Sequence, residues 1–376
     1  MESIVIVGGG IIGTNIAYAL RHHDDVTLIE KNTLGSGTTA ASMGRPSWDS
    51  AHPFNTYLQR EAWRTYGPLI EDGSVAFDRS GYMIVANDDI QLEAIRAKAA
   101  TLTEYGFEPE ILEGRAVEPH GLDPSAVTGG LYFPEGGYIN QQDAVEYFAE
   151  GARAEGVHIE TGTAVTDIQT EHGHVSGVET TSETYRADIV VNAAGPWAPK
   201  INDFVDVSLP LRHTTGPILV LETESELSIP YLSKLEGAFY FRPEGPSKAL
   251  AGRRWGRYDE AERLDPDTAI EIPESFRNDV SRIAKEYLPQ LADAALINEW
   301  IGLRTITPDF NPIVGNLLTR GPDGLLVACG MSGAGVGLAP VISRVLVDTI
   351  DGVDSDLRRI LSADRFGAGR TETDAS

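Results

Sequence analysis

Three glycines near the amino end have the spacing of a dinucleotide-binding turn. Gly8, Gly10 and Gly13 follow the short apolar run Ile4–Val7, which predicts a buried parallel strand. In a G-x-G-x-x-G turn the first glycine permits a sharp bend and the second lets the backbone approach a pyrophosphate. The third lets a helix pack closely on the strand. Because apolar residues at helical spacing follow Gly13, the pattern predicts strand, phosphate-binding turn and helix in this order.

An acidic residue completes this unit. Glu30 ends the second predicted strand, Val26–Ile29, and its carboxylate can accept hydrogen bonds from the hydroxyl pair of a ribose. An acid in this place disfavours a 2′-phosphate, so the motif indicates NAD or FAD rather than NADP, without choosing between those two. A turn whose glycines have only a structural role is the alternative, and the ordered context argues against it.

Two more glycine-rich segments lie where strands of such a sheet would end. Residues 34–44 form a loop of small and hydroxyl side chains on the side of the sheet where ligands bind. Residues 330–337 form a second loop between the predicted strand Gly324–Cys329 and the predicted helix Leu338–Ile350. A helix start behind such a loop presents exposed N–H groups and the positive end of the helix dipole. We therefore expect both loops to contact a ligand.

The remaining elements predict an α/β protein with a second, antiparallel part. Periodicity predicts helices at Phe54–Ile70, Gln91–Tyr105, Gln142–Glu155 and Ser275–Tyr287. It predicts strands at Phe77–Ala86, Val157–Thr161, Ala164–Thr170, Val175–Glu179, Thr184–Ala187, Asp188–Gly195, Pro217–Glu222, Ala238–Arg242 and Lys248–Gly252. From Leu211 onward, strands separated by turns predict an antiparallel sheet over the ligand. We expect the tail, residues 367–376, to be disordered.

The composition is strongly acidic. The 376 residues carry 56 acidic and 30 basic side chains, a formal net charge of −26, and only six of the basic residues are lysine. Such a surface repels nucleic acid and anionic membranes, and high salt would screen its self-repulsion. We therefore hypothesise a halophilic cytoplasm as the working environment, with an acidic enzyme of a low-salt cell as the alternative.

Hydropathy and cysteine content further limit the class of protein to which the chain can belong. No stretch of about eighteen apolar residues occurs, so we expect no membrane span. The first predicted strand begins at Ile4, which leaves no room for a signal peptide and favours a cytoplasmic location. Cys329 is the only cysteine, and its apolar surroundings predict a buried, inert thiol. No spacing of cysteine and histidine indicates a metal site.

Taken in order, these motifs resemble those of one family. The similarity rests on the amino-terminal unit with Glu30, residues 35–44, Gly136–Asn140, Val190–Trp197, and Gly302–Gly315 with residues 330–337. Over nearly the whole chain they resemble the FAD-dependent amine and amino-acid oxidoreductases, the group that contains D-amino-acid oxidase, glycine oxidase and monomeric sarcosine oxidase. The resemblance implies that FAD is the cofactor.

The resemblance also implies a discontinuous domain organisation. An FAD-binding, Rossmann-like domain similar to that of glutathione reductase would comprise residues 1–82, 139–212 and 301–376. A substrate-binding domain with an antiparallel sheet would comprise residues 83–138 and 213–300.

By the same resemblance, a large set of residues would surround FAD. Glu30 would hold the adenosine ribose, Ile11 would face the pyrophosphate, and the backbone of Val165 would meet the adenine. The other implied cofactor residues are Gly8, Gly10, Ile12, Gly13, Lys31, Thr38, Thr39, Ala40, Ser42, Met43, Gly44, Ala193, Ala194, Gly195, Trp197, Gly302, Arg304, Ser332, Gly333, Ala334, Gly335, Val336 and Gly337.

The resemblance singles out Arg304 for substrate binding. An arginine in the matching segment of glycine oxidase and D-amino-acid oxidase pairs with the substrate carboxylate, and a guanidinium fork suits a carboxylate physically. The alternative is an arginine that only pairs with one of the many acids. Arg45 and Arg242 are weaker carboxylate candidates, Tyr240 can bind substrate or merely pack, and His213 is expected to be a structural histidine.

Two positions depart from monomeric sarcosine oxidase. Gly302 stands where a covalent flavin thioether would be attached, so the resemblance implies non-covalent FAD. Gly337 stands where that protein has a lysine in its carboxyl-terminal glycine loop. These departures leave Arg304 as the main anion-binding residue and favour a site closer to that of glycine oxidase.

The implied reaction is oxidation of the C–N bond of a small amino acid or N-alkyl amino acid, of the glycine, sarcosine or D-amino-acid type. Arg304 would fix the carboxylate, hydride would pass from the α-carbon to the flavin, and the imine would hydrolyse in water. Such chemistry needs no acid–base dyad when the amine binds neutral, and the sequence shows none. The exact substrate, the electron acceptor and the oligomeric state stay open, so a homo-oligomer and a separate acceptor partner are both compatible.

Two other functions are alternatives. A related flavoenzyme acting on a 2-hydroxy acid or glycerol phosphate would need a basic cluster, which Arg253, Arg254 and Arg257 can provide. An FAD-binding subunit of a larger dehydrogenase complex would relay electrons without oxidising a small amine, and it would leave Arg304 unexplained.

Overall fold

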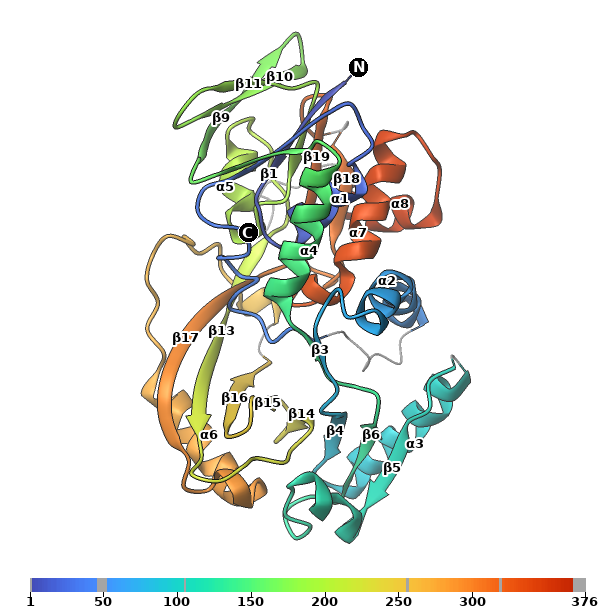
Figure 1. Ribbon diagram of the computed structural model, residues 1–376, viewed down its shortest axis with the longest axis vertical. Coiled ribbons are helices and arrows are strands. Elements are labelled where there is room, and N and C mark those ends of the chain that lie inside the picture. The colour runs from blue at the N-terminus through green and yellow to red at the C-terminus, as the bar shows by residue number, and fades with distance from the viewer. Residues whose placement is uncertain (1, 46–52, 105, 255–256, 318–319, 368–376) are drawn as a thin grey trace.

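Two large β-sheets form the framework of the protein (Figure 1). The computed structural model describes residues 2–367 except for 46–52, 105, 255–256 and 318–319. A six-stranded sheet with its helices fills the upper half of Figure 1, and an eight-stranded sheet fills the lower half. The described residues also form a three-stranded sheet and a two-stranded one.

The six-stranded sheet is almost entirely parallel. Its order is β18 (Ile313–Asn316), β19 (Leu325–Cys329), β12 (Ile189–Asn192), β1 (Ser3–Val7), β2 (Asp25–Glu30) and β8 (His158–Thr161). Only β18, at one edge, runs antiparallel to its neighbour. Short apolar runs become the central strands because both faces of a parallel sheet are covered.

The two faces of this sheet carry different layers. Ile4 and Ile6 of β1 pack with the helices on one face, whereas Val5 and Val7 pack with the three-stranded sheet and a short helix on the other. The first layer contains α1 (Ile11–Ala19), α2 (Pro53–Glu71), α4 (Gln141–Ala154), α7 (Gly335–Ile350) and α8 (Asp356–Leu361). The second contains β9 (Val165–Glu171), β10 (His174–Thr180), β11 (Thr184–Arg186) and α5 (Ala198–Asp203).

The eight-stranded sheet is antiparallel with one exception. Its order is β17 (Ala295–Ile306), β13 (Arg212–Glu222), β16 (Lys248–Arg253), β15 (Phe239–Glu244), β14 (Tyr231–Leu235), β4 (Tyr82–Ala86), β6 (Gly129–Phe133) and β5 (Glu110–Glu113). The pair β14–β4 is parallel, within a sheet that the sequence predicted as antiparallel. Helix α6 (Glu274–Tyr287) packs on one face through Phe276, whose ring stacks on that of Phe239. Helix α3 (Asp89–Glu104) packs through Leu92 and Ile95 in a separate core.

Most predicted elements are confirmed within two or three residues at either end. One predicted strand, Phe77–Ala86, is wrong as a single element. It divides into β3 (Phe77–Asp78), which pairs with β7 (Tyr138–Ile139) in the two-stranded sheet, and β4 in the eight-stranded sheet. The chain turns between them at Gly81, whose φ of +81° favours glycine. The prediction merged two extended pieces across the polar residues 78–81 and did not recognise the turn there.

Several predictions are not tested by the structure. The predicted disordered tail, apart from residue 367, and Tyr105 at the end of a predicted helix lie outside the described residues. The predicted domain boundaries stay a prediction. Over the part of the chain that is described, no helix combines the length and the apolar character that a membrane crossing demands.

The amino-terminal unit depends on a close approach between α1 and β1. A Cβ atom on Gly13 would lie 1.8 Å from the carbonyl oxygen of Gly8, far inside van der Waals contact. Helix α1 therefore sits against the strand end only because residue 13 has no side chain, as its place in the motif predicts.

We predict that Gly13→Ala destabilises the protein by roughly 1–3 kcal/mol or more, because the helix must move away from the strand end. Chemical unfolding of the cofactor-free protein measures this change. Gly37→Ala is the matched control, since its added Cβ would meet the Trp197 ring at an ordinary 3.6 Å. Equal stability of the two variants would show that the close approach does not constrain the fold.

Candidate active site

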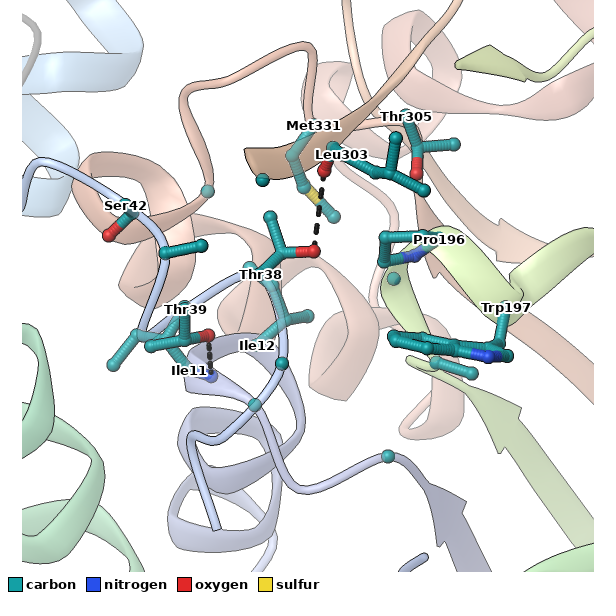
Figure 2. A pocket seen from close by; sticks show the side chains of 18 of the residues that line it. Ile11, Ile12, Thr38, Thr39, Ser42, Pro196, Trp197, Leu303, Thr305 and Met331 are labelled. Atoms are coloured by element: carbon teal, nitrogen blue, oxygen red, sulfur yellow. Dashed lines mark hydrogen bonds between the residues drawn. The ribbon is translucent and has the colours of Figure 1, made fainter. Parts of the chain in front are cut away.

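A cavity of about 700 Å³ lies at the carboxyl ends of the parallel strands, between the two large sheets (Figure 2). Its floor comes from residues that end or directly follow four neighbouring strands, namely Gly8, Glu30, Ala193 and Gly330. Its roof includes Tyr240 of the eight-stranded sheet. Ligands of open α/β sheets bind at this edge of the sheet, so the cavity is the candidate site.

The amino-terminal glycine turn forms the first wall of the cavity. Gly8 has a φ of +111°, and a Cβ there would lie 2.7 Å from the carbonyl oxygen of Ala193. The Glu30 carboxylate accepts hydrogen bonds from the N–H of Gly9 at 2.7 Å and of Asn32 at 2.8 Å. These contacts hold the acid at the end of β2, where the motif places a ribose.

Residues 34–44 form a second wall, which is fastened on two sides. The Thr39 hydroxyl accepts from the N–H of Ile11 at 3.1 Å, at the start of α1. The Thr38 hydroxyl donates to the carbonyl of Leu303 in β17 at 3.3 Å, as Figure 2 shows. The indole of Trp300, also in β17, donates to the carbonyl of Ala41 at 3.3 Å. The loop therefore joins the first helix to the edge strand of the other sheet.

The second glycine-rich loop forms a third wall. Gly330, Ser332 and Gly333 have φ values of +69°, +50° and +85°, so the loop bends sharply before α7 begins at Gly335. No side chain caps the amino end of α7, and its first turn contains no acid. The exposed N–H groups and the positive end of the helix dipole thus face the cavity, where they suit an electron-rich ring.

These walls fit FAD in three respects: a side-chain-free turn at a helix start, an anchored acid for a ribose, and a second helix start. Most of the predicted cofactor residues line the cavity together with three of the four predicted substrate residues, as follows: Gly8, Gly10, Ile11, Ile12, Glu30, Lys31, Thr38, Thr39, Ser42, Met43, Gly44, Arg45, Val165, Ala193, Ala194, Gly195, Trp197, Tyr240, Gly302, Arg304, Ser332, Gly333, Gly335 and Val336. Their individual contacts with FAD stay predictions.

Four predicted cofactor residues do not line the cavity. Gly13 packs against Gly8, which is a structural role that its motif position also predicts. Ala40 is exposed, and its backbone N–H donates to the carbonyl of Gly35 rather than facing the cavity. Ala334 precedes α7, and Gly337 is buried within that helix. Sequence spacing placed these residues in the right loops but could not tell which way each one faces.

Arg304 lies in β17 with its guanidinium held by three oxygen acceptors. Its Nη1 donates to the carbonyl of Thr215 at 3.2 Å, and its Nη2 to the carbonyl of Arg253 at 3.0 Å and the hydroxyl of Tyr240 at 3.3 Å. Among the residues that the structure describes, no carboxylate pairs with it. The prediction that Arg304 merely pairs with an acid is therefore not supported.

Two glycines make room for this arrangement. A Cβ on Gly216 would lie 2.9 Å from Nη2 of Arg304, and one on Gly252 would lie 2.4 Å from the ring of Tyr240. The side chains of Arg304 and Tyr240 can therefore extend across neighbouring strands and meet at the cavity wall.

The other predicted basic residues have different positions. Arg45 lines the cavity and donates to the hydroxyl of Tyr82 at 3.1 Å. Arg242 is buried outside the cavity, paired with Glu244 at 2.8 Å, so it is not a substrate candidate. Of the predicted basic cluster, only Arg254 lines the cavity, whereas Arg257 is exposed and pairs with Asp259 at 2.7 Å. The three arginines do not form one phosphate site.

Several lining residues were not predicted. They include Thr163, Ala164, Lys200, Gly216, Ile218, Tyr231, Ser233, Asp267 and Met331. The residues from the eight-stranded sheet face the cavity through sheet register, which a single sequence does not reveal. Only Lys200 could have been suspected from the sequence, because lysine is scarce in this chain.

Asp267 joins the two rims of the cavity at the Glu30 end. Its carboxylate accepts from Lys31 at 3.0 Å, from the indole of Trp197 at 2.7 Å and from Lys200 at 2.6 Å. The ammonium of Lys31 also lies 3.7 Å from the centroid of the Trp197 ring. Hydrogen bonds from Lys200 and Trp197 hold the pKa of Asp267 well below its usual range.

His213 fixes the segment that carries Asp267. Its Nδ1 accepts from the N–H of Leu264 at 3.0 Å, so its Nε2 carries the proton and donates to the carbonyl of Pro196 at 3.0 Å. Burial lowers the pKa of this histidine, which is 2% exposed. The expectation of a structural histidine is confirmed.

Cys329 is buried at the end of β19, and burial raises the pKa of its thiol to about 12. A thiol with that pKa is protonated and inert at neutral pH, as its apolar surroundings predict.

The comparisons with known proteins agree with this geometry. A model of the FAD dependent oxidoreductase (DAO) family matches residues 3–349. Human mitochondrial dimethylglycine dehydrogenase is 28% identical over 336 residues, which cover 83% of this chain but 38% of that protein. Glycine oxidase of Geobacillus kaustophilus is 27% identical over 93% of this chain and 92% of its own length. The chain thus spans about two fifths of the first relative and nearly all of the second.

Solved structures show the same fold. The crystal structure of L-proline dehydrogenase from P. horikoshii superposes with a TM-score of 0.86 at 23% identity, and the match covers 97% of both chains.

The lowered pKa of His213 predicts a pH dependence of stability. Protonation favours the unfolded chain, where the histidine has its ordinary pKa near about 6.5. The contribution of the neutral imidazole is therefore complete above that pH and is lost as the pH falls below it. We expect the unfolding temperature to fall more between about pH 8 and about pH 5.5 in the native protein than in His213→Gln. An equal fall in both proteins would show that His213 does not titrate with unfolding.

Proposed function

The chain belongs to the family of FAD-dependent oxidoreductases, and on this premise we propose that it oxidises the C–N bond of a small amino acid or N-alkyl amino acid. The observation that carries the proposal is the guanidinium of Arg304. It lines the cavity, is fixed by neutral acceptors and pairs with no carboxylate of the described chain. The names of the relatives, dimethylglycine dehydrogenase, glycine oxidase and L-proline dehydrogenase, refer to amino acids of this kind.

The charge of Arg304 supports an anionic substrate. A partly buried cation without an ionic partner is costly, and a carboxylate would supply the charge and two parallel hydrogen bonds. The acids among the described lining residues are Glu30 and Asp267. Glu30 accepts from the N–H groups of Gly9 and Asn32, and Asp267 accepts from Lys31, Trp197 and Lys200, so neither pairs with Arg304. A substrate carboxylate would thus meet Arg304 without competition from protein acids.

The position of Arg304 also orients the substrate. Its side chain runs beside the second glycine loop, since a Cβ on Gly333 would lie 3.3 Å from its Cδ. A carboxylate bound to the guanidinium would therefore place the substrate α-carbon close to that loop. When bound, FAD would supply the two-electron oxidation, and positioning would supply much of the rate.

No histidine is among the described residues that line the cavity, and the two lining carboxylates, Glu30 and Asp267, are already hydrogen-bonded to other groups. The hydroxyl of Tyr240, which lies beside Arg304, already accepts from it. His213 packs against Pro196 rather than lining the cavity. The substrate amine would therefore bind neutral and lose its proton to solvent beforehand, which amine oxidation permits.

The rival activity on glycerol phosphate finds less support. A phosphate needs several basic groups, and Arg257 is turned away from the cavity toward Asp259. We propose further that the acidic surface suits the salt-rich cytoplasm of a halophile, and that the reduced flavin passes its electrons to oxygen or to a separate acceptor.

We predict that Arg304→Met lowers the preference for an amino acid over its carboxamide by roughly 100- to 1000-fold in kcat/KM, because only the acid uses the guanidinium. The ratio for glycine and glycinamide, and for sarcosine and its amide, cancels differences in amine reactivity. Arg115→Met is the matched control, since Arg115 is exposed and pairs with Glu118 away from the cavity.

An unchanged ratio in Arg304→Met, with the flavin spectrum intact, would contradict carboxylate binding at Arg304. If the ratio is unchanged because kcat/KM falls equally for the acid and the amide, the arginine supports the structure of the cavity rather than binding the substrate.

A further inference from the structure

We propose that residues 257–268, here called the clasp, close over the adenosine end of the cofactor groove, and that Asp267 controls how fast FAD leaves. This proposal concerns the binding of FAD and does not depend on which substrate the protein oxidises. It makes Asp267 a positioning residue, which acts through Lys31, Lys200 and Trp197.

The base of the clasp is held mostly by hydrogen bonds to its backbone. The N–H of His213 donates to the carbonyl of Glu262 at 2.6 Å, and Arg212 donates to the carbonyls of Tyr258 at 3.2 Å and Ala261 at 3.3 Å. Leu264 is held by the His213 ring. The base also has one ion pair, between Arg263 and Asp203 of α5. Salt screens that pair but scarcely affects the backbone contacts, so these keep the base attached to the start of β13.

The tip of the clasp is held by charge. Beyond Leu264, Asp265 and Asp267 both pair with Lys200, and Asp267 pairs with Lys31 as well. The chain has only six lysines, and two of them meet at this one carboxylate. Because the Asp267 side chain is 51% exposed, its ion pairs are open to screening by salt.

The tip connects opposite rims of the groove. Lys31 directly follows Glu30 at the end of β2, whereas Trp197 and Lys200 follow β12. Asp267 is the one residue of the clasp that lines the cavity, so the tip forms part of the groove wall between these rims. Since Glu30 marks the ribose site, the clasp covers the adenosine half of FAD and leaves the Arg304 end to the substrate.

A clasp with a fixed base and an ionic tip predicts a specific kinetic behaviour. Detachment of the tip opens the groove, and its frequency rises as salt or substitution weakens the ion pairs. Release of FAD would therefore depend on Asp267, whereas the fold would not.

The test is the rate of FAD release from the holoprotein, followed by the rise in flavin fluorescence after dilution. We expect Asp267→Asn to accelerate release roughly five- to thirtyfold, since it weakens three hydrogen bonds, two of them to lysines. Raising KCl from about 0.1 M to about 2 M should accelerate release from the native protein more than from this variant.

Asp259→Asn is the matched control. It removes the same charge from the same segment, but Asp259 is exposed and pairs with Arg257. We expect its release rate and salt dependence to equal those of the native protein. Asp267→Glu should restore slow release in part.

Lys200→Met provides a second, independent variant. This substitution by itself should accelerate release. Combined with Asp267→Asn, it should accelerate release by less than the product of the two single effects, because both substitutions weaken the same Lys200–Asp267 contact. Native release rates in Asp267→Asn, or equal acceleration in Asp259→Asn, would overturn the proposal. So would full additivity of Lys200→Met and Asp267→Asn.

Discussion

The site depends on a guanidinium that is held by carbonyl oxygens instead of a carboxylate. Arg304 reaches this position because β17 and β13 pair along their whole length, with Thr214 opposite Arg304 and Gly216 opposite Gly302. The missing side chain at residue 216 lets the guanidinium lie across β13 and meet the carbonyls of Thr215 and Arg253. Neutral acceptors orient the cation without neutralising it, so its charge is left for a ligand.

The paired strands β13 and β17 also join the two halves of the cavity. β17 is fastened to residues 34–44 through Thr38 and Trp300, while that loop is fastened to the start of α1 through Thr39. Substrate anchor and cofactor turn are thus parts of one connected framework. In a chain of net charge −26, the cations Lys31, Arg45, Lys200, Arg254 and Arg304 nevertheless gather around this cavity, as expected for an anionic cofactor and an anionic substrate.

Much of the cofactor half could be predicted from sequence, because local chemistry determines it. The glycine turn, Glu30 and the second glycine loop each combine backbone freedom with a short-range motif, and each lies where the motif places it. The covering half could not be predicted in the same way. Tyr231 and Ser233 face the cavity through the register of distant strands, and Asp267 reaches it through an irregular segment that has no periodicity. The split of Phe77–Ala86 between two sheets has the same cause, since partner strands rather than propensity decide where an extended run ends.

The most direct test of the account is an anaerobic absorbance titration of the FAD-loaded protein, in high salt, with glycine, sarcosine, proline and both enantiomers of alanine. The account predicts that the oxidised flavin band bleaches with at least one of these amino acids, and that the rate of recovery in air distinguishes an oxidase from a dehydrogenase. A flavin that stays oxidised with every amino acid but bleaches with a 2-hydroxy acid or glycerol phosphate would contradict it.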